Sequence, residues 1–300
     1  MGNREYGWSR SCGARTQGAP DVPSGKTGES ENDLNGDAIE KLDAFFRAFT
    51  GAAKPVLLLD YDGTLAPFRV DRFTARPWAG VRELLTRIQN EGRTRVVVVT
   101  GRPAAEISPL LGVDPAPEVW GLHGAERLHA DGRRELEITP PETRAKLDAL
   151  CTKLRGDPFG GLIEEKPNAV AMHWRGVAPG KAKAIDKRVR ALFEPLAQMD
   201  GLNVLEFEAG LELRAGRDKG DVVNVLLEET DSAGPQPIAY LGDDLTDEAA
   251  FRAIKGRGLS VLARRQSRAT DADVWLRPPG ELKNFLQRWL RACRLLDPVK

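Results

Sequence analysis

Cysteine is scarce in this sequence, and its placement fits no metal site. Three occur in 300 residues, at Cys12, Cys151 and Cys293. Zinc sites use closely spaced pairs of cysteine or histidine, and a disulfide framework uses an even number of cysteines, so neither is predicted. Unpaired thiols are typical of proteins in a reducing compartment, and we therefore expect a cytoplasmic protein.

The chain also lacks an excess of charge of either sign. Its 44 lysine and arginine residues balance 44 aspartate and glutamate residues, and no basic stripe carries aromatic platforms. No overall field therefore attracts nucleic acid or an anionic membrane, and we expect neither as a partner. An anionic ligand must instead be bound by a local cluster of side chains.

Long hydrophobic runs are missing as well. The longest span four to six residues, far short of the about 20 that cross a bilayer. The first twenty residues hold no apolar segment typical of a secretory signal. Residues 1–36 are rich in glycine, serine and charged residues, and they predict a disordered N-terminal tail. We expect a soluble protein that is a monomer.

Three short segments are apolar throughout, at Val56–Leu59, Val96–Val99 and Ile238–Leu241. Such uninterrupted patterns are typical of parallel strands that are buried on both faces between helices. Amphipathic helical patterns lie between them, at Pro77–Asn90 and Asp218–Glu229. The alternation predicts an α/β fold with a doubly wound, Rossmann-like core around a parallel sheet.

A segment of different character interrupts this core. Residues 140–215 predict two helices, around Glu142–Leu154 and Gly180–Met199, together with three short strands. A unit of this kind between two halves of a doubly wound sheet indicates an inserted small α/β cap domain. We therefore expect four regions, which are the tail at 1–36, the first part of the core at 37–139, the cap at 140–215 and the second part of the core at 216–300.

Polar residues follow each of the three buried strands. The motifs are DYDGTL after the first, VTGR after the second and GDDLTDE after the third, while DKGD opens the helix that precedes the third. Because ligands of an open parallel sheet bind at the carboxyl ends of its strands, we expect these residues to share one pocket. They are Asp60, Asp62, Thr100, Gly101, Arg102, Lys219, Asp243, Asp244 and Asp247.

So many carboxylates in one pocket repel one another and require a cation. Oxygen ligands from aspartate suit Mg²⁺, and we expect it to be bound by Asp60, Asp62, Asp243 and Asp244. Lys219 adds positive potential at the same place. A site of this kind is built to receive a dianion, which favours phosphoryl transfer.

The order of the groups suggests a role for each of four residues. Asp60 is the candidate nucleophile, because it is nearest to the end of its strand, and it would form an aspartyl-phosphate. Asp62 would protonate the leaving alkoxide and later deprotonate the attacking water. Thr100 would donate a hydrogen bond to the transferring phosphoryl group, and Lys219 would hold that group against the nucleophile.

These motifs, in this order, resemble those of the haloacid dehalogenase superfamily, over a stretch from about Val56 to Leu290. Dehalogenases of that superfamily lack the second acid of the first motif, and its P-type ATPases carry threonine there. Asp62 occupies that position here. The resemblance therefore implies a phosphatase with a haloacid dehalogenase-like core.

The chain is further similar to the trehalose-6-phosphate phosphatase family, in WGLHGAE, EEKPNAVAMHWR and LELR as well as in the core motifs. This resemblance implies Mg²⁺-dependent hydrolysis of trehalose 6-phosphate in trehalose biosynthesis, with trehalose-6-phosphate synthase as a functional partner. It also implies a cap that closes over the sugar. The substrate-binding residues that it implies are Gly101, Arg102, His123, Gly124, Glu126, Lys166, Asn168, His173, Arg175 and Glu212.

The cap strand within AVAMHWR has a pattern that agrees with such a site. Alternation along a strand would place Val170, Met172 and Trp174 on one face and His173 and Arg175 on the other. The second pair would then face the active site. The alternative is a sheet face exposed to solvent.

Several of these residues have ordinary structural alternatives when each is taken alone. Asp247 could be the N-cap of the next helix, and Lys219 a solvated lysine at a helix start. His123 could be a hydrogen-bonded histidine at a strand end. Glu126 could form a surface ion pair with Arg127.

The sequence departs from the family at some cap positions. Phe207 and Glu208 stand where the family usually has Gly–Lys, and Ala215 stands where it usually has proline. The phosphoryl-transfer residues are unaffected, so a phosphatase of another sugar phosphate, such as a sucrose, glucosylglycerol or pseudo-disaccharide phosphate, remains the alternative. A catalytically silent partner of the synthase should have lost its catalytic acids or Lys219, and this chain keeps them.

Overall fold

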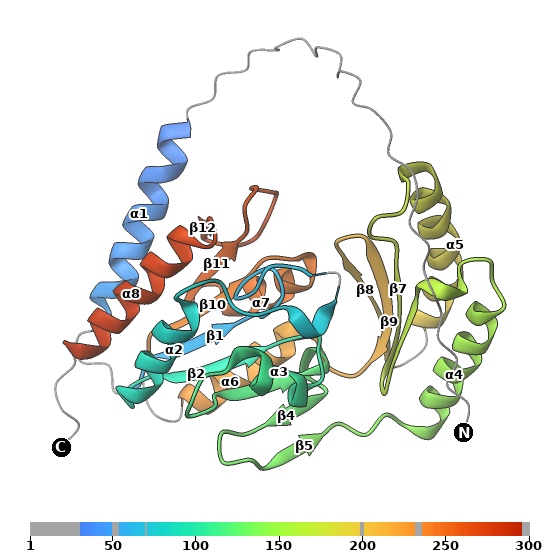
Figure 1. Ribbon diagram of the computed structural model, residues 1–300, viewed down its shortest axis with the longest axis horizontal. Helices are drawn as coiled ribbons and strands as arrows, with labels where there is room; N and C mark the ends of the chain where they lie inside the picture. Colours follow the sequence, from blue (N-terminus) through green and yellow to red (C-terminus); the bar gives the residue numbers. More distant parts are fainter. Residues whose placement is uncertain (1–30, 50–53, 70, 199–200, 232–235, 296–300) are drawn as a thin grey trace, which may run out of the picture.

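The computed structural model describes residues 31–49, 54–69, 71–198, 201–231 and 236–295 (Figure 1). The expected N-terminal tail lies outside the described residues as far as residue 30. A helix, α1 (Glu31–Arg47), begins within the last part of that expected tail. In the part of the chain that is described, no helix has both the length and the apolar composition to cross a membrane.

The core is built on an eight-stranded sheet, as the alternation of strands and helices predicts (Figure 1). The strands from β12 to β3 are parallel, and β4 and β5 add an antiparallel edge. The chain runs outward from β1 in one direction and from β10 in the other, so the topological switch point lies between these two strands. In order of pairing the strands are β12 (Val274–Leu276), β11 (Leu259–Ala263), β10 (Ile238–Gly242), β1 (Val56–Leu59), β2 (Arg95–Val99), β3 (Glu118–Gly121), β4 (Glu126–Leu128) and β5 (Arg134–Leu136).

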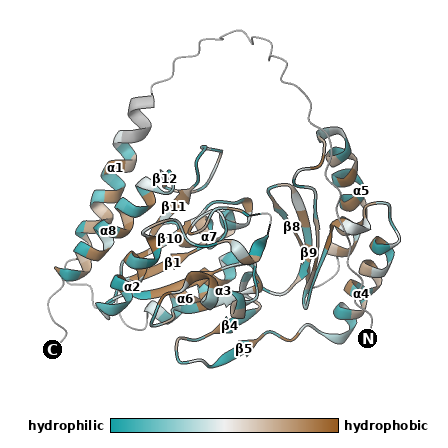
Figure 2. Cartoon of the chain, viewed as in Figure 1, coloured by the Kyte–Doolittle hydropathy of each residue, from teal (hydrophilic) through white to brown (hydrophobic). Residues whose placement is uncertain are grey.

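Helices cover both faces of this sheet, which explains why its central strands are apolar throughout (Figure 2). Leu57 and Leu59 pack toward one group of helices, and Leu58 packs toward the other. The helix expected from Pro77 begins later because Gly80 has a left-handed backbone, with φ of 85°. The first group is α1, α2 (Val81–Asn90), α3 (Ala104–Leu111) and α8 (Gly280–Arg294), and the second is α6 (Lys219–Asp231) and α7 (Glu248–Ile254).

The cap is a second, four-stranded antiparallel sheet with two helices on one face (Figure 1). Figure 1 shows these helices on the side away from the core, so the other face of the sheet is turned toward the core. We call this other face the inner face of the cap. The elements are β6 (Ile163–Lys166), β7 (Ala169–His173), β9 (Gly210–Ala215) and β8 (Leu202–Phe207), in order of pairing, with α4 (Pro141–Arg155) and α5 (Pro179–Ala197).

Candidate active site

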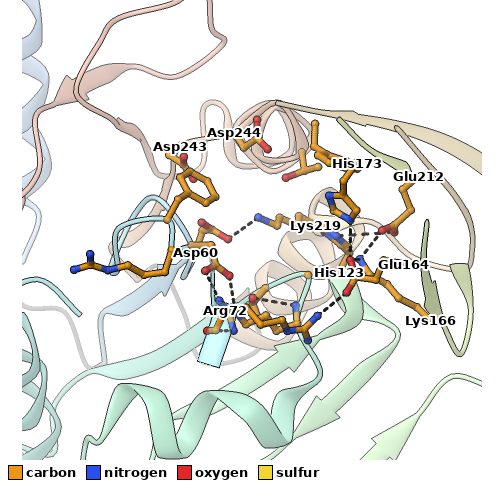
Figure 3. A pocket seen from close by; sticks show the side chains of 18 of the residues that line it. Asp60, Arg72, His123, Glu164, Lys166, His173, Glu212, Lys219, Asp243 and Asp244 are labelled. Atoms are coloured by element: carbon orange, nitrogen blue, oxygen red, sulfur yellow. Dashed lines mark hydrogen bonds and ion pairs between the residues drawn. The ribbon is translucent and has the colours of Figure 1, made fainter. Parts of the chain in front are cut away.

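A cavity of about 480 Å³ lies where the carboxyl ends of the core strands meet the inner face of the cap (Figure 3). It is at the topological switch point, where ligands of doubly wound sheets bind. Figure 3 shows the acids of the core on one side and the polar side chains of the cap on the other. The predicted residues that line it are Asp60, Asp62, Thr100, Gly101, Arg102, His123, Lys166, His173, Glu212, Lys219, Asp243 and Asp244.

Asp60 and Lys219 form a buried ion pair at the bottom of the cavity. Asp60 continues β1, because its N–H donates to the carbonyl oxygen of Leu241 (2.8 Å). Lys219 reaches it from the first turn of α6, with Nζ 2.7 Å from Asp60 Oδ1. Burial would lower the pKa of Lys219, yet the carboxylates of Asp247 and Asp60 raise it above its usual value. The ammonium is therefore charged and fixed in position.

Asp247 holds several of these groups in place. Its Oδ1 accepts from Lys219 Nζ (2.6 Å) and from the Tyr240 hydroxyl (2.7 Å). Its Oδ2 accepts from the main-chain N–H groups of Asp243 and Asp244 (both 2.9 Å). Asp247 is fully buried. It belongs to the capping box of the short 3₁₀ helix Leu245–Asp247, so its hydrogen bonds fix both the lysine and the acidic loop.

The carboxylates of Asp60 and Asp243 fit a divalent cation. Together with Asp247 they form a group whose ligand atoms lie within 4.8 Å of one another. Asp243 Oδ1 is buried and has no hydrogen-bond partner, which is costly unless a cation binds it. Burial raises the pKa of Asp60, although the charge of Lys219 lowers it. Burial and the negative charge of Asp60 raise the pKa of Asp243 well above its usual value. A cation would stabilise both as carboxylates.

Two of the expected metal ligands accept hydrogen bonds that the sequence did not predict. Both carboxylate oxygens of Asp62 accept from Arg102, each at 2.6 Å. The carboxylate of Asp244 accepts the N–H of Glu208 (3.0 Å) and that of Leu245 (2.8 Å). These hydrogen bonds do not use all the lone pairs of the two carboxylates, so the assignment of Asp62 and Asp244 as metal ligands stays a prediction. Sequence reasoning missed the hydrogen bonds because Arg102 and Glu208 are distant in the chain.

His123 lies between the acids of the core and the cap. Its main-chain N–H donates to the carbonyl oxygen of Thr100 (2.8 Å), and its ring Nε2 is 4.0 Å from Glu212 Oε1. Burial and the nearby cations of Arg214 and Lys166 lower its pKa well below its usual value, so the ring is neutral. Its Nδ1 is buried and has no hydrogen-bond partner. A hydroxyl group of a ligand could satisfy it.

The inner face of the cap supplies a row of polar side chains. Pairing across β6, β7 and β9 places Glu164 beside Ala171 and Ala171 beside Glu212. Lys166 Nζ donates to Glu212 Oε2 (2.6 Å), and His173 Nε2 is 2.9 Å from Glu164 Oε2. Sequence reasoning named Lys166 but missed Glu164, although the period of two along a strand relates them.

Arg72 links the cap to the core. It lies in the 3₁₀ helix Arg72–Thr74, which follows β1. Its guanidinium binds Glu106 of α3 (2.6 Å) and Glu164 of the cap (2.6 Å). Burial alone would raise the pKa of Glu164, but the hydrogen bond with His173 and the charge of Lys166 lower it to about 2. The contact between cap and core therefore stays charged at ordinary pH.

Replacing Arg72 with glutamine is expected to raise KM for a large substrate by about two- to fivefold, because a partly exposed ion pair contributes about 1 kcal/mol or less. Loss of this contact would favour separation of the cap from the core. Steady-state kinetics would measure it, with Glu106→Gln as the control, since that variant keeps the pair between Arg72 and Glu164. An unchanged KM in Arg72→Gln would show that the contact does not help to close the cap.

Known proteins are similar to this chain in sequence and in fold. The sequence model of the trehalose-phosphatase family matches residues 58–275. This chain belongs to the trehalose-phosphatase family. It is 32% identical over 264 residues to the trehalose-phosphate phosphatase of Mycobacterium avium. The matched region is 81% of this chain and 65% of that protein. The chain spans 58% to 65% of the length of such mycobacterial relatives.

Solved structures agree with this membership. Trehalose-6-phosphate phosphatase of Aspergillus fumigatus has a TM-score of 0.62 and 25% identity, with 86% of this chain and 97% of that chain covered. A phosphatase of the haloalkanoate (HAD) superfamily from Bacteroides thetaiotaomicron has a TM-score of 0.54 and 19% identity, with 79% and 95% covered. The second likeness shows the fold alone, and it confirms the predicted haloacid dehalogenase-like core with a cap.

Phe207 is one of the departures from the usual pattern of the trehalose-phosphatase family, and its ring lines the cavity. It pairs with Gly210 across β8 and β9, and its ring lies over that glycine, where a side chain would collide with it. The ring centroid is 5.0 Å from that of His173. An aromatic surface thus occupies a position where the family usually has a small or charged residue. Sequence reasoning noted the departure but not its place in the cavity.

Among the predicted substrate-binding residues, four do not line the cavity: Gly124, Glu126, Asn168 and Arg175. Glu126 Oε2 accepts the N–H of Ala104, the first residue of α3 (2.7 Å), so this carboxylate caps a helix. Asn168 donates to the carbonyl oxygen of Ala215 (3.0 Å). Arg175 comes after the end of β7, and its guanidinium lies over the ring of Phe68, 4.4 Å from the centroid. We therefore assign no substrate contact to these four residues.

Proposed function

We propose that this chain hydrolyses trehalose 6-phosphate to trehalose and phosphate. The observation that carries the proposal is the buried group formed by Asp60, Lys219 and Asp243, in which an ammonium and two acids converge at the ends of β1 and β10. It supports transfer of a phosphoryl group. The trehalose-phosphate phosphatases among the relatives support the choice of substrate.

Each step uses a group of this chain. One oxygen of Asp60 attacks phosphorus, the bond from phosphorus to the sugar oxygen breaks, and an aspartyl-phosphate forms. Asp62 gives its proton to the leaving oxygen and then accepts a proton from the attacking water. The hydroxide formed attacks phosphorus, so that phosphate leaves and Asp60 is restored. Lys219 and Thr100 hold the phosphoryl oxygens.

Asp62 and an incoming phosphate group compete for Arg102. Arg102 binds both oxygens of Asp62 in this structure, and it also lines the cavity. An incoming phosphate dianion competes for this guanidinium. Release from Arg102 leaves the Asp62 carboxyl group free to exchange a proton with the leaving oxygen and later with water.

The oxygens of Asp60 and Asp243 are suited to hold Mg²⁺. Asp247 is close to both, but Lys219, Tyr240 and two main-chain N–H groups already bind its oxygens. When bound, Mg²⁺ would neutralise part of the acidic charge and polarise a phosphoryl oxygen.

The test of this proposal is release of phosphate from trehalose 6-phosphate, measured with Mg²⁺ and with a chelator. We expect turnover that the chelator abolishes and that added Mg²⁺ restores. Equal turnover in both conditions would contradict the assignment of Asp60 and Asp243 as metal ligands. Absence of turnover in both would contradict the proposed function.

The inner face of the cap is proposed to bind the sugar. Glu164, Lys166 and Glu212 offer charged groups for vicinal hydroxyls, and His123 offers a neutral ring. Phe207 offers an aromatic face for the apolar side of a sugar ring. Recognition of the disaccharide therefore depends on residues of the cap and on one histidine of the core.

Replacing Phe207 with alanine is expected to raise KM for trehalose 6-phosphate by about fivefold, because an aromatic contact of this kind contributes about 1 kcal/mol. KM for glycerol 3-phosphate, which does not reach the cap, should change little. Steady-state kinetics on both substrates would measure the difference. Leu205→Ala is the matched control, because Leu205 lies on the same strand as Phe207, where it pairs with Glu212 of β9, but it does not line the cavity. Equal changes with both substrates would exclude a sugar contact.

A further inference from the structure

A second cavity, of about 510 Å³, adjoins the candidate active site. Its walls come from the segments that follow β1 and β11, within residues 63–78 and 264–278. It shares Phe68, Arg69 and Asp243 with the first cavity. The proposed mechanism makes no use of it.

Positive charge predominates in this second cavity. Arg69, Arg264 and Arg265 line it, together with two acids, Glu208 and Asp243. Arg264 donates to the main-chain carbonyl oxygen of Asp243 (3.2 Å) and lies 3.8 Å from the carboxylate of Glu208. Among the described residues, no carboxylate pairs with Arg69 or Arg265. Two guanidinium groups are thus available to a ligand.

The cavity has a fixed aromatic wall. The indole Nε1 of Trp78 donates to the carbonyl oxygen of Thr64 (3.2 Å). The main-chain N–H of Trp78 donates to the carbonyl oxygen of Leu65 (2.9 Å). Arg265 lies over the ring, with Cζ 5.6 Å from the centroid. The ring holds the guanidinium at the cavity by a cation–π contact and leaves its N–H groups free. The wall formed by Trp78 and Arg265 is therefore in place before a ligand arrives.

We propose that this cavity is a second anion site, which binds a phosphate group through Arg69 and Arg265 and does not require a metal. Guanidinium groups bind phosphate oxygens in a bidentate manner, and these two line one cavity with no carboxylate partner among the described residues. The inference goes beyond the proposed function and does not depend on it. The ligand is either inorganic phosphate, which the active site would release next to this cavity, or the phosphate group of a separate ester.

Binding of inorganic phosphate to the full chain in the presence of a chelator tests this proposal. Calorimetry measures the affinity, and the fluorescence of Trp78 reports binding at this cavity. We expect saturable binding that Arg69→Gln and Arg265→Gln each weaken by about tenfold or more, as loss of a charge-assisted contact predicts. Trp78→Phe should remove the fluorescence change and keep the heat of binding.

Two control variants separate this cavity from the active site. Arg102→Gln removes an arginine that lines only the first cavity, and Arg291→Gln removes an exposed arginine of α8. Both should keep the fluorescence change. Tighter binding of phosphate than of glycerol 3-phosphate identifies the product as ligand, and the reverse identifies an ester. Absence of saturable binding, or binding that is lost in Arg102→Gln and kept in Arg265→Gln, would overturn the proposal.

Discussion

Replacing Asp60 with asparagine is expected to lower the rate of phosphate release by at least about 10⁴-fold, the size of loss seen when a nucleophile is removed. The amide cannot form the aspartyl-phosphate, and it is a poorer ligand for a cation. Lys219 keeps its bond to Asp247, so the fold should persist. Phosphate release under saturating substrate measures the effect.

The control for this variant is Asp271→Asn, which changes a carboxylate that is paired with Arg252 on the surface. It should keep full activity. Circular dichroism and thermal unfolding of Asp60→Asn should resemble those of the unchanged protein. A folded Asp60→Asn variant that retains more than a small fraction of the activity would show that another group attacks phosphorus.

Replacing Asp247 with alanine is expected to destabilise the protein by about 3–5 kcal/mol, the cost of breaking a buried ion pair from one side. The change leaves Lys219 with one carboxylate fewer and removes the acceptor of Tyr240 and of two main-chain N–H groups. Thermal unfolding should show a decrease in Tm of roughly 10 °C. Activity should also be lost at temperatures where the variant is folded, because Lys219 and Asp243 are no longer fixed.

A matched change on the surface separates this effect from a general loss of charge. Asp271→Ala removes an exposed partner of Arg252, and it should cost less than about 1 kcal/mol. If Asp247→Ala unfolded at the same temperature as Asp271→Ala, the hydrogen bonds of Asp247 would not be important for stability. The role assigned to this residue would then be wrong.

The core and the position of the cavity could be predicted because both follow from local patterns. Strands such as Val56–Leu59 are apolar throughout, and helices cover both of their faces in the structure. Asp60 and Asp243 are 183 residues apart in the numbering, yet each directly follows a central strand, and parallel strands end at the same edge of the sheet. The topology alone therefore brings them together.

Pairings between distant side chains could not be predicted in this way. Arg72 binds Glu164, 92 positions away, and no local sequence pattern predicts that contact. Arg102 reaches Asp62 from another loop and donates to both of its carboxylate oxygens, a pairing that neither motif indicates alone. Such choices depend on which side chain is near enough after folding.

The cap shows how far an alternating pattern extends. Val170 and Met172 pack in the core of the cap, as predicted, and His173 lines the cavity. Arg175 follows the same alternation in the sequence, but β7 ends at His173. Beyond that residue the period of two no longer applies, and Arg175 turns to Phe68 instead.

The most direct test of the central claim is a comparison of kcat/KM for Mg²⁺-dependent phosphate release across several sugar phosphates. The set should contain trehalose 6-phosphate, a sucrose phosphate, a glucosylglycerol phosphate and glycerol 3-phosphate. The account predicts the highest kcat/KM for trehalose 6-phosphate, by about a hundredfold or more over glycerol 3-phosphate, because only the disaccharide reaches the cap. A higher value for another member of the set would contradict the proposed substrate.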